Sequence, residues 1–332
     1  MQTENGALRK VRIYGTLGPA CGDPNILERM LREGMDGVRL NLSHSSLEEA
    51  GGLLHACRAA AEACGVPCEL LIDMQGPELR IGALKDPLPL RAGELLAADV
   101  LPFPKAVREA LSIGQEVLLD DGKLLLRAES GGLRVVRGGV LESRKSVALP
   151  GIAIPTPAMT EADREHIRKA AAFGVTAVMQ PFVRSAEDLL AVRSALDRAG
   201  GREIRLLAKV ENAAGIAHLN ELIPHCDEIV IARGDLGNAM PLWELPAAQK
   251  RIAAACRSAN RDFMVVTQML DSMMRRAVPT RAEVSDIFNA VLDGAASVMV
   301  TGETASGDYP IEAIRYLNKT VREAEAYRSS LS

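Results

Sequence analysis

Polar side chains follow most of the apolar runs in this 332-residue chain, at the residues where each run ends. Glu211 and Asp235 end two successive runs, and they form a pair of carboxylates without an accompanying His or Cys. Such a pair suits a hard divalent cation, Mg²⁺ or Mn²⁺. Lys209 and Arg39 add positive charge for an anionic group. Together these residue types fit metal-assisted chemistry on a phosphorylated or 2-oxo-acid substrate.

Two local patterns support an anion site. Lys209 and Glu211 are two residues apart on an extended segment, so their side chains project from the same face. The stretch ARGDLGNAMP places a glycine-flanked turn at Gly234, and a short helix there would present backbone N–H groups to a carboxylate or phosphate. Of the five histidines only His44 falls near this set, so His-based catalysis is not expected.

The elements that must position these residues are short apolar strands alternating with amphipathic helices. Eight strand-like runs occur, at 11–18, 37–42, 68–74, 175–182, 204–210, 228–234, 262–268 and 297–302. Apolar strands that alternate with helices indicate a parallel sheet covered on both faces. Eight units favour an α/β fold of the closed (β/α)₈ TIM-barrel type. An open doubly wound sheet fits the pattern too, but the first strand lacks the glycine fingerprint of a dinucleotide site.

The strand ends are most informative when taken together. One polar residue at a strand end could be half of a structural ion pair. Polar residues at six strand ends favour an active site, because barrel enzymes build their sites from several strand ends. The residues are Arg39, Asn41, Ser43, Asp73, Lys209, Glu211, Arg233, Asp235, Thr267, Gln268, Thr301 and Glu303.

One unit of the barrel pattern is interrupted. Between Gly82 and about Ile154 the sequence changes to short alternating runs separated by turn signals. This predicts barrel segments at 1–82 and 154–332 and a small β-rich domain at 83–153, inserted after the third strand. An insertion at that loop lies at the catalytic end of a barrel, and we interpret it as a lid.

Composition excludes several other classes of protein. The net charge of −4 argues against a nucleic-acid or anionic-membrane partner. The chain lacks an apolar run of about 18 residues and an N-terminal signal pattern. Six scattered cysteines are typical of reduced thiols in the cytoplasm, where we expect the protein to act.

Eight ordered motifs resemble the pyruvate kinase family: GVRLNLSHSS, DMQGPELRIG, VLLDDG, ALPG, AKVENAAGI, ARGDLG, VTQMLDSMMRRAVPTRAEVSDIFNAVLDGA and TGETASGDYP. The resemblance implies a glycolytic kinase that converts phosphoenolpyruvate and ADP to pyruvate and ATP with Mg²⁺ (or Mn²⁺) and K⁺. It implies that Lys209 stabilises the phosphoryl group in flight, that Arg39 contacts the phosphate, and that Thr267 assists protonation of the enolate.

The same resemblance implies the binding residues. These are Arg39, Lys209, Ala232, Gly234, Asp235 and Thr267 for the substrate; Glu211 and Asp235 for the divalent metal; Asn41, Ser43, Asp73 and the carbonyl of Met74 for K⁺; and Arg80, Lys145, Asn41 and His44 for the nucleotide. Glu78 resembles the K⁺-dependent branch of the family.

Departures from the family pattern leave alternatives open. Met74 and Gln75 stand where the family has threonine and lysine, and Pro181 replaces a serine near the transferred phosphate. The chain could therefore act on a different enol phosphate or 2-oxo acid, or be a catalytically weak regulatory homologue. Since it stops at Ser332, we expect the family's C-terminal regulatory domain to be absent, leaving a monomer or a homodimer.

Overall fold

The computed structural model describes residues 11–330 except 98, 121, 153 and 155. The chain forms two compact units. The first contains the chain up to Gly76 and from Ala158 onward, and the second is Pro77–Pro157. The predicted limits of the insertion, 83 and 153, fall inside the second unit, and residue 153 lies outside the described residues.

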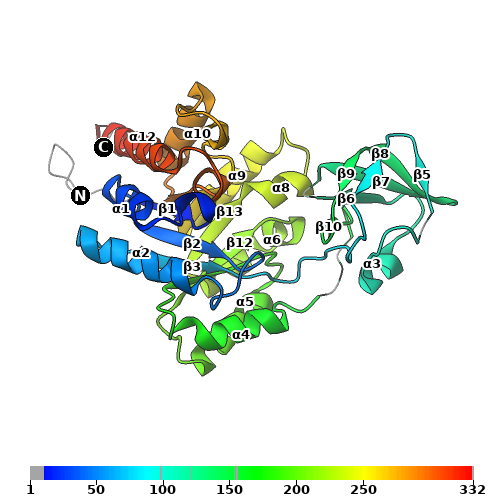
Figure 1. Ribbon diagram of the computed structural model, residues 1–332, viewed down its shortest axis with the longest axis horizontal. Helices are drawn as coiled ribbons and strands as arrows, with labels where there is room; N and C mark the ends of the chain where they lie inside the picture. Colours follow the sequence, from blue (N-terminus) through cyan, green and yellow to red (C-terminus); the bar gives the residue numbers. More distant parts are fainter. Residues whose placement is uncertain (1–10, 98, 121, 153, 155, 331–332) are drawn as a thin grey trace. The chain divides into compact units, whose positions relative to one another are not determined.

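Eight parallel strands close into a barrel in the first unit, which confirms the predicted fold class (Figure 1). Their order around the barrel is β1-β15-β14-β13-β12-β11-β3-β2. Every neighbouring pair is parallel, so all eight carboxyl ends meet at one end of the barrel. The strands are β1 (Arg12–Thr16), β2 (Gly37–Asn41), β3 (Glu69–Asp73), β11 (Ala177–Gln180), β12 (Arg205–Val210), β13 (Glu228–Ala232), β14 (Asp262–Val266) and β15 (Ser297–Met299).

Helices surround the barrel strands. They are α1 (Pro24–Arg32), α2 (Gly51–Cys64), α4 (Glu161–Ala170), α5 (Ala186–Arg198), α6 (Ala213–Ala217), α7 (Leu219–Leu222), α8 (Arg233–Ala239), α9 (Leu245–Ser258), α10 (Arg281–Leu292), α11 (Gly302–Ala305) and α12 (Pro310–Ser330), with 3₁₀ turns at Pro19–Cys21, Ile223–His225 and Asp271–Met274. Side chains determine where several of these helices begin. They accept hydrogen bonds from the first backbone N–H groups, which have no partner within the helix. Thr160 and Asp163 form a capping box at α4, and Thr280 and Glu283 form one at α10.

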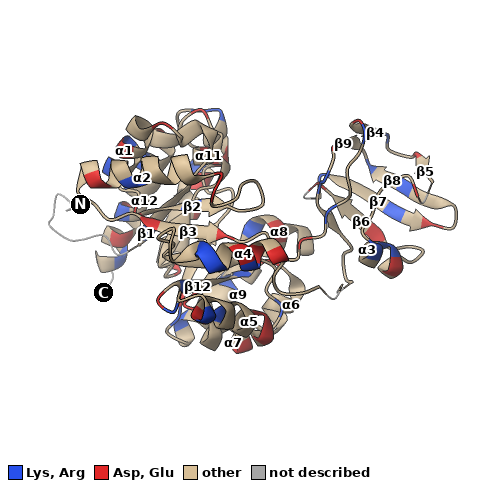
Figure 2. Cartoon of the chain, turned by 60° about the horizontal axis from the view of Figure 1, so that its bottom comes forward, with Lys and Arg blue, Asp and Glu red and all other residues tan. Residues whose placement is uncertain are grey.

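The barrel strands have two apolar faces. Residues such as Ile13, Ile72 and Ile229 pack outward against the helices. Tyr14, Leu71 and eight other buried residues from alternate positions fill the interior. This alternation explains why the sequence shows near-continuous apolar runs, since both faces of each strand are buried. Charged residues of both signs are mixed along outer helices such as α1, α4 and α5 (Figure 2). No described helix is both long enough and apolar enough to cross a membrane.

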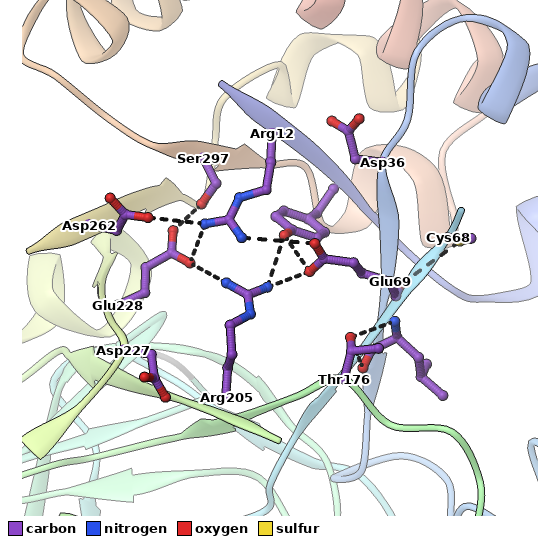
Figure 3. Close-up of polar contacts among 12 residues, drawn as sticks. Arg12, Asp36, Cys68, Glu69, Thr176, Arg205, Asp227, Glu228, Asp262 and Ser297 are labelled. Atoms are coloured by element: carbon purple, nitrogen blue, oxygen red, sulfur yellow. Dashed lines mark hydrogen bonds and ion pairs between the residues drawn. The ribbon is translucent and has the colours of Figure 1, made fainter. Parts of the chain in front are cut away.

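A charge network joins the amino ends of the barrel strands (Figure 3). Glu228, which is fully buried, lies 3.1 Å from Arg12 Nη2 and 3.3 Å from Arg205 Nη1, and it accepts a hydrogen bond from Ser297. Arg205 also contacts Glu69, whose Oε2 accepts from the Tyr14 hydroxyl at 2.9 Å. Asp262 on β14 also pairs with Arg12, at 3.4 Å. Six strands therefore contribute to this charge network, at the end opposite the strand carboxyl ends.

The second unit has its own small sheets and core. β10 (Val147–Ala148), β6 (Glu116–Leu119), β7 (Leu124–Glu129), β8 (Gly132–Arg137) and β5 (Leu95–Leu96) pair antiparallel in that order. β4 (Leu88–Leu90) pairs with β9 (Gly139–Leu141), and α3 (Lys105–Ala110) precedes β6. Sixteen buried apolar residues, Val117 and Leu126 among them, form a separate core.

Candidate active site

Lys209 lies at the centre of the charged side chains on the carboxyl ends of the barrel strands. Its Nζ is 3.2 Å from Asp73 Oδ2 and 3.4 Å from Glu211 Oε2. Arg39 on β2 donates from Nε (3.0 Å) and Nη2 (2.7 Å) to Asp73 Oδ2. The three side chains predicted from β2, β3 and β12 are thus brought together.

The opposite charges in this cluster keep the buried Asp73 and Lys209 side chains ionised. Burial by itself would raise the pKa of Asp73, but the Lys209 and Arg39 cations hold that pKa below its usual value. Burial would likewise favour neutral Lys209, yet the Asp73 and Glu211 carboxylates raise the pKa of the amine above its usual value. Lys209 therefore carries a fixed positive charge in a place of low polarisability, where an anion is attracted strongly.

Glu211 has one oxygen engaged and one without a hydrogen bond. Its Oε1 accepts from the backbone N–H of Phe182 at 2.6 Å. Its Oε2 is buried and accepts no hydrogen bond from the described residues, because Lys209 is close but not aligned as a donor. Burial, with repulsion from Asp235 and Asp73, raises the pKa of Glu211 to about 7 despite the attraction of Lys209. A buried oxygen with no donor, on a carboxylate that a second carboxylate repels, is what a cation ligand would show.

Asp235 stands on the first turn of α8, which follows β13 directly after Ala232. The predicted short helix at this turn is confirmed. Gly234 packs closely here, because a Cβ would lie 3.2 Å from Thr267 Cγ2. Ala232, the last residue of β13, is buried, and the turn that follows it places Gly234 against Thr267.

Thr267 follows β14 in a strained backbone conformation. Its φ is +79° and that of Gln268 is +54°, a region that β-branched residues rarely occupy. Arg233 holds the Thr267 carbonyl with bonds from Nε (3.1 Å) and Nη2 (2.7 Å), and its Nη1 lies 2.6 Å from Asp286 on α10. Strain that surrounding contacts maintain at a strand end is typical of functional residues.

Residues of the predicted K⁺ set lie on the β2 and β3 ends. Asn41 Oδ1 accepts from the backbone N–H of Ser43 at 3.1 Å. Met74 is buried, and its N–H donates to the Met179 carbonyl at 3.1 Å. Asp73, also in the predicted set, is already paired with Arg39 and Lys209, so cation ligation by its carboxylate remains a prediction.

Asp163 is a buried residue that sequence reasoning missed. Beyond capping α4, its two oxygens accept from the backbone N–H groups of Gln75 (2.9 Å) and Gly76 (3.1 Å), which follow β3. The T-x-x-D spacing indicates a capping box. The bonds to Gln75 and Gly76, 88 and 87 positions earlier, form where the chain leaves for the second unit and returns from it, which the local spacing does not show.

Pro181, the departure from the family pattern, packs against this same turn. A Cβ on Gly76 would lie 2.3 Å from Pro181 Cγ, so glycine is required opposite the ring. The next residue, Phe182, has φ +53° and donates the N–H that binds Glu211. This amide was also missed, since backbone donors carry no sequence signal.

The predicted nucleotide residues are divided between the two units. In the second unit Arg80 bridges to Ser146 and pairs with Glu78 at 2.5 Å, while Lys145 lies 3.1 Å from Asp120 Oδ1. In the first unit His44 is exposed just after β2. Nucleotide binding by these residues and Asn41 remains a prediction.

Comparison with known proteins identifies the family. The family model "Pyruvate kinase, barrel domain" matches residues 8–314. The chain is 36% identical to the pyruvate kinase of Geobacillus stearothermophilus over 96% of its own length and 57% of that protein's. It is 37% identical to the pyruvate kinases of Methylorubrum extorquens and Aeropyrum pernix, covering 69% of each and 96% and 93% of itself. The chain thus spans between about half and two thirds of these relatives, and it belongs to the pyruvate kinase family.

Proposed function

We propose that this chain transfers a phosphoryl group from phosphoenolpyruvate to ADP, giving pyruvate and ATP. The observation that carries the proposal is the Lys209 ammonium, held between Asp73 and Glu211 beside the Arg39 guanidinium. Catalysis of phosphoryl transfer consists largely of positioning and of neutralising charge on the phosphoryl oxygens. Two cations, Arg39 on β2 and Lys209 on β12, supply that charge at the carboxyl end of the barrel.

A divalent cation, Mg²⁺ or Mn²⁺, fits the residues present. Glu211 and Asp235 would hold it, since Glu211 Oε2 is buried and accepts no hydrogen bond from the described residues. Mg²⁺ commonly binds one or two protein carboxylates and completes its coordination shell with substrate and water oxygens. When bound, the cation would supply positive charge to substrate oxygens. It would also relieve the repulsion between the two carboxylates.

Substrate orientation and proton delivery fall to α8 and Thr267. The backbone at Gly234 and Asp235 would bind the substrate carboxylate at the start of α8. The Thr267 side chain lies against Gly234, with Oγ1 3.7 Å from the position of a Cβ there. A hydroxyl next to the bound carboxylate is placed to assist protonation of the enolate formed when the phosphoryl group leaves.

The remaining assignments complete the proposal. K⁺ would bind near Asn41, Ser43, Asp73 and the Met74 carbonyl, and Arg80 with Lys145 would contact nucleotide phosphates. As a glycolytic enzyme the protein would act in the cytoplasm, and we retain the homodimer as its simplest assembly.

A second candidate function rests on Pro181. Its ring, packed against Gly76, stands where the family has a serine hydroxyl. Loss of that donor favours a relative that uses the same enolate chemistry on another enol phosphate or 2-oxo acid.

One paired assay separates the two candidates. ATP formation from phosphoenolpyruvate and ADP is measured beside exchange of the pyruvate methyl protons with deuterium in the presence of phosphate. Both activities together support pyruvate kinase. Proton exchange without ATP formation supports the second candidate, and loss of both contradicts the enolate site.

A further inference from the structure

Two thiols meet on the outer side of the barrel, away from the charged cluster. Cys57 Sγ on α2 lies 3.5 Å from Sγ of Cys68, the residue before β3. Both are free thiols. Cys64 and Cys68 are the cysteines closest in sequence, four residues apart. In the structure, however, Cys68 lies next to Cys57.

The turn after α2 explains this pairing. Gly65 has φ +63° and ends the helix, and the N–H of Val66 returns to the Ala61 carbonyl at 3.1 Å. The chain therefore reverses, and Cys68 runs back along the helix to the level of Cys57. Cys64 lies two helical turns from Cys57 and contacts the Glu28 carbonyl of α1 at 3.6 Å.

A cavity gives small molecules access to the thiol pair. It has a volume of about 240 Å³, and both sulfur-bearing residues line it with Leu54, Phe173 and Arg58. Its wall is mostly apolar and carries two charged residues, Arg58 and Glu69, so it admits a small neutral reagent and has one cation available for a thiolate. A disulfide requires the sulfurs to approach to about 2.05 Å, a movement of roughly 1.5 Å that side-chain torsions can supply.

The two thiols differ in reactivity. The hydrogen bond between the two thiols and the charge of Arg58 lower the pKa of Cys57, although burial opposes them. The same hydrogen bond, with burial, raises the pKa of Cys68. Cys57 is thus suited to be the attacking thiolate and Cys68 the resolving thiol.

We propose that Cys57 and Cys68 form a reversible dithiol–disulfide site that reacts with small hydroperoxides entering this cavity. The Cys57 thiolate attacks one peroxide oxygen, which breaks the O–O bond, forms a sulfenic acid and releases hydroxide. The Cys68 thiol then attacks Cys57 Sγ, forming the disulfide, and its proton leaves with the sulfenic hydroxyl as water. The proton that Cys57 released on ionisation neutralises the hydroxide of the first step. The two thiols lose two electrons, and the peroxide is reduced to two waters. This site is independent of the proposed phosphoryl transfer.

The test exposes the folded chain to hydrogen peroxide, removes the reagent, and counts free thiols after denaturation. The chain has six cysteines, so the expected count falls from six to four. Peptide mapping should find Cys57 joined to Cys68, and dithiothreitol should restore all six thiols. Cys226 and Cys256 serve as internal controls, because burial raises the pKa of each to about 12 and keeps them protonated.

Single cysteine-to-serine variants test which two thiols form the disulfide. Cys57→Ser and Cys68→Ser should each form no disulfide under the same treatment, whereas Cys64→Ser and Cys226→Ser should still lose two thiols. If the wild-type chain keeps six thiols, oxidises evenly at all positions, or pairs Cys64 with Cys68, the proposal is wrong. The wild-type measurement decides this even if a serine variant does not fold.

Discussion

The Nζ of Lys209 and the Oδ2 of Asp73 lie 3.2 Å apart, with only 14% and 3% of the two side chains exposed. Arg39 shares the same Asp73 oxygen. One buried carboxylate thus holds two cations in place, the Lys209 ammonium and the Arg39 guanidinium, where they can neutralise charge on an incoming phosphoryl group. The proposed metal site at Glu211 adjoins this cluster, because Lys209 also lies 3.4 Å from Glu211.

Glu211→Gln is expected to weaken Mn²⁺ binding at least tenfold, or by about 1.4 kcal/mol. The amide keeps the shape of the side chain but removes the charge facing Asp235. Titration followed by electron paramagnetic resonance measures the affinity. Glu62→Gln, an exposed change on α2, is the control. Equal affinity in Glu211→Gln and wild type would remove Glu211 from the metal site.

The stability of the metal-free protein should fall with rising pH because of Glu211. Its pKa is raised from 4.5 to about 7 in the folded chain. Between these values the folded chain keeps a proton that the unfolded chain has lost, so the stabilisation present at low pH is lost as pH rises through about 7. Urea unfolding in EDTA at pH 5 and pH 8 should show a larger decrease for wild type than for Glu211→Gln, on the order of 3 kcal/mol. A smaller decrease in wild type would contradict this assignment.

Substitutions of Thr267 should change activity and stability independently. Thr267→Gly removes the cost of φ +79° and should be about 1 kcal/mol more stable than Thr267→Ala. Both variants lack the hydroxyl, so both should lose enolate protonation, and Thr267→Ser should retain part of it. Chemical denaturation and proton-exchange rates measure the two effects. The account of the strained backbone is wrong if the glycine variant is the less stable.

Much of the barrel can be predicted, because each strand appears in the sequence as a short run of consecutive apolar residues. Strands such as β12 and β13 are buried on both faces, which leaves continuous apolar runs in the sequence. Lys209 and Glu211 stand out because charge is unusual at the end of such runs. The predicted barrel and the gathering of Arg39, Asp73, Lys209 and Glu211 follow from these two signals.

Contacts that depend on barrel closure were not predictable. Arg12 reaches Glu228 from a strand far away in sequence. Asp163 likewise meets the Gln75 amide only after the chain has returned from the inserted second unit. Single charged residues at strand starts are indistinguishable from surface residues until the strands are side by side. The positive φ of Thr267 likewise has no local cause, since contacts from Arg233 maintain it.

The charge network at the amino ends of the barrel strands should affect stability but not kcat. Glu228→Ala leaves Arg12 and Arg205 without their buried partner and should lower the free energy of unfolding by about 2–4 kcal/mol. This loss is smaller than that for a fully buried ion pair, because both arginines are partly exposed. Asp262→Ala removes an exposed member of the same network and should cost under about 1 kcal/mol. Denaturant unfolding measures both, and kcat should be unchanged in each. A loss of kcat in Glu228→Ala without loss of folded protein would contradict a purely structural role.

The central claim is that Lys209 stabilises the phosphoryl group during transfer, and phosphorus-31 NMR tests it most directly. Phosphoenolpyruvate, ADP, Mg²⁺ and K⁺ are incubated with wild type, with Lys209→Met, and with the exposed control Lys250→Met. We predict that wild type and the control form ATP as phosphoenolpyruvate disappears, and that Lys209→Met is slower by about 10²–10³ at saturating substrate. No ATP from the wild-type chain, or an undiminished rate in Lys209→Met, would contradict the account.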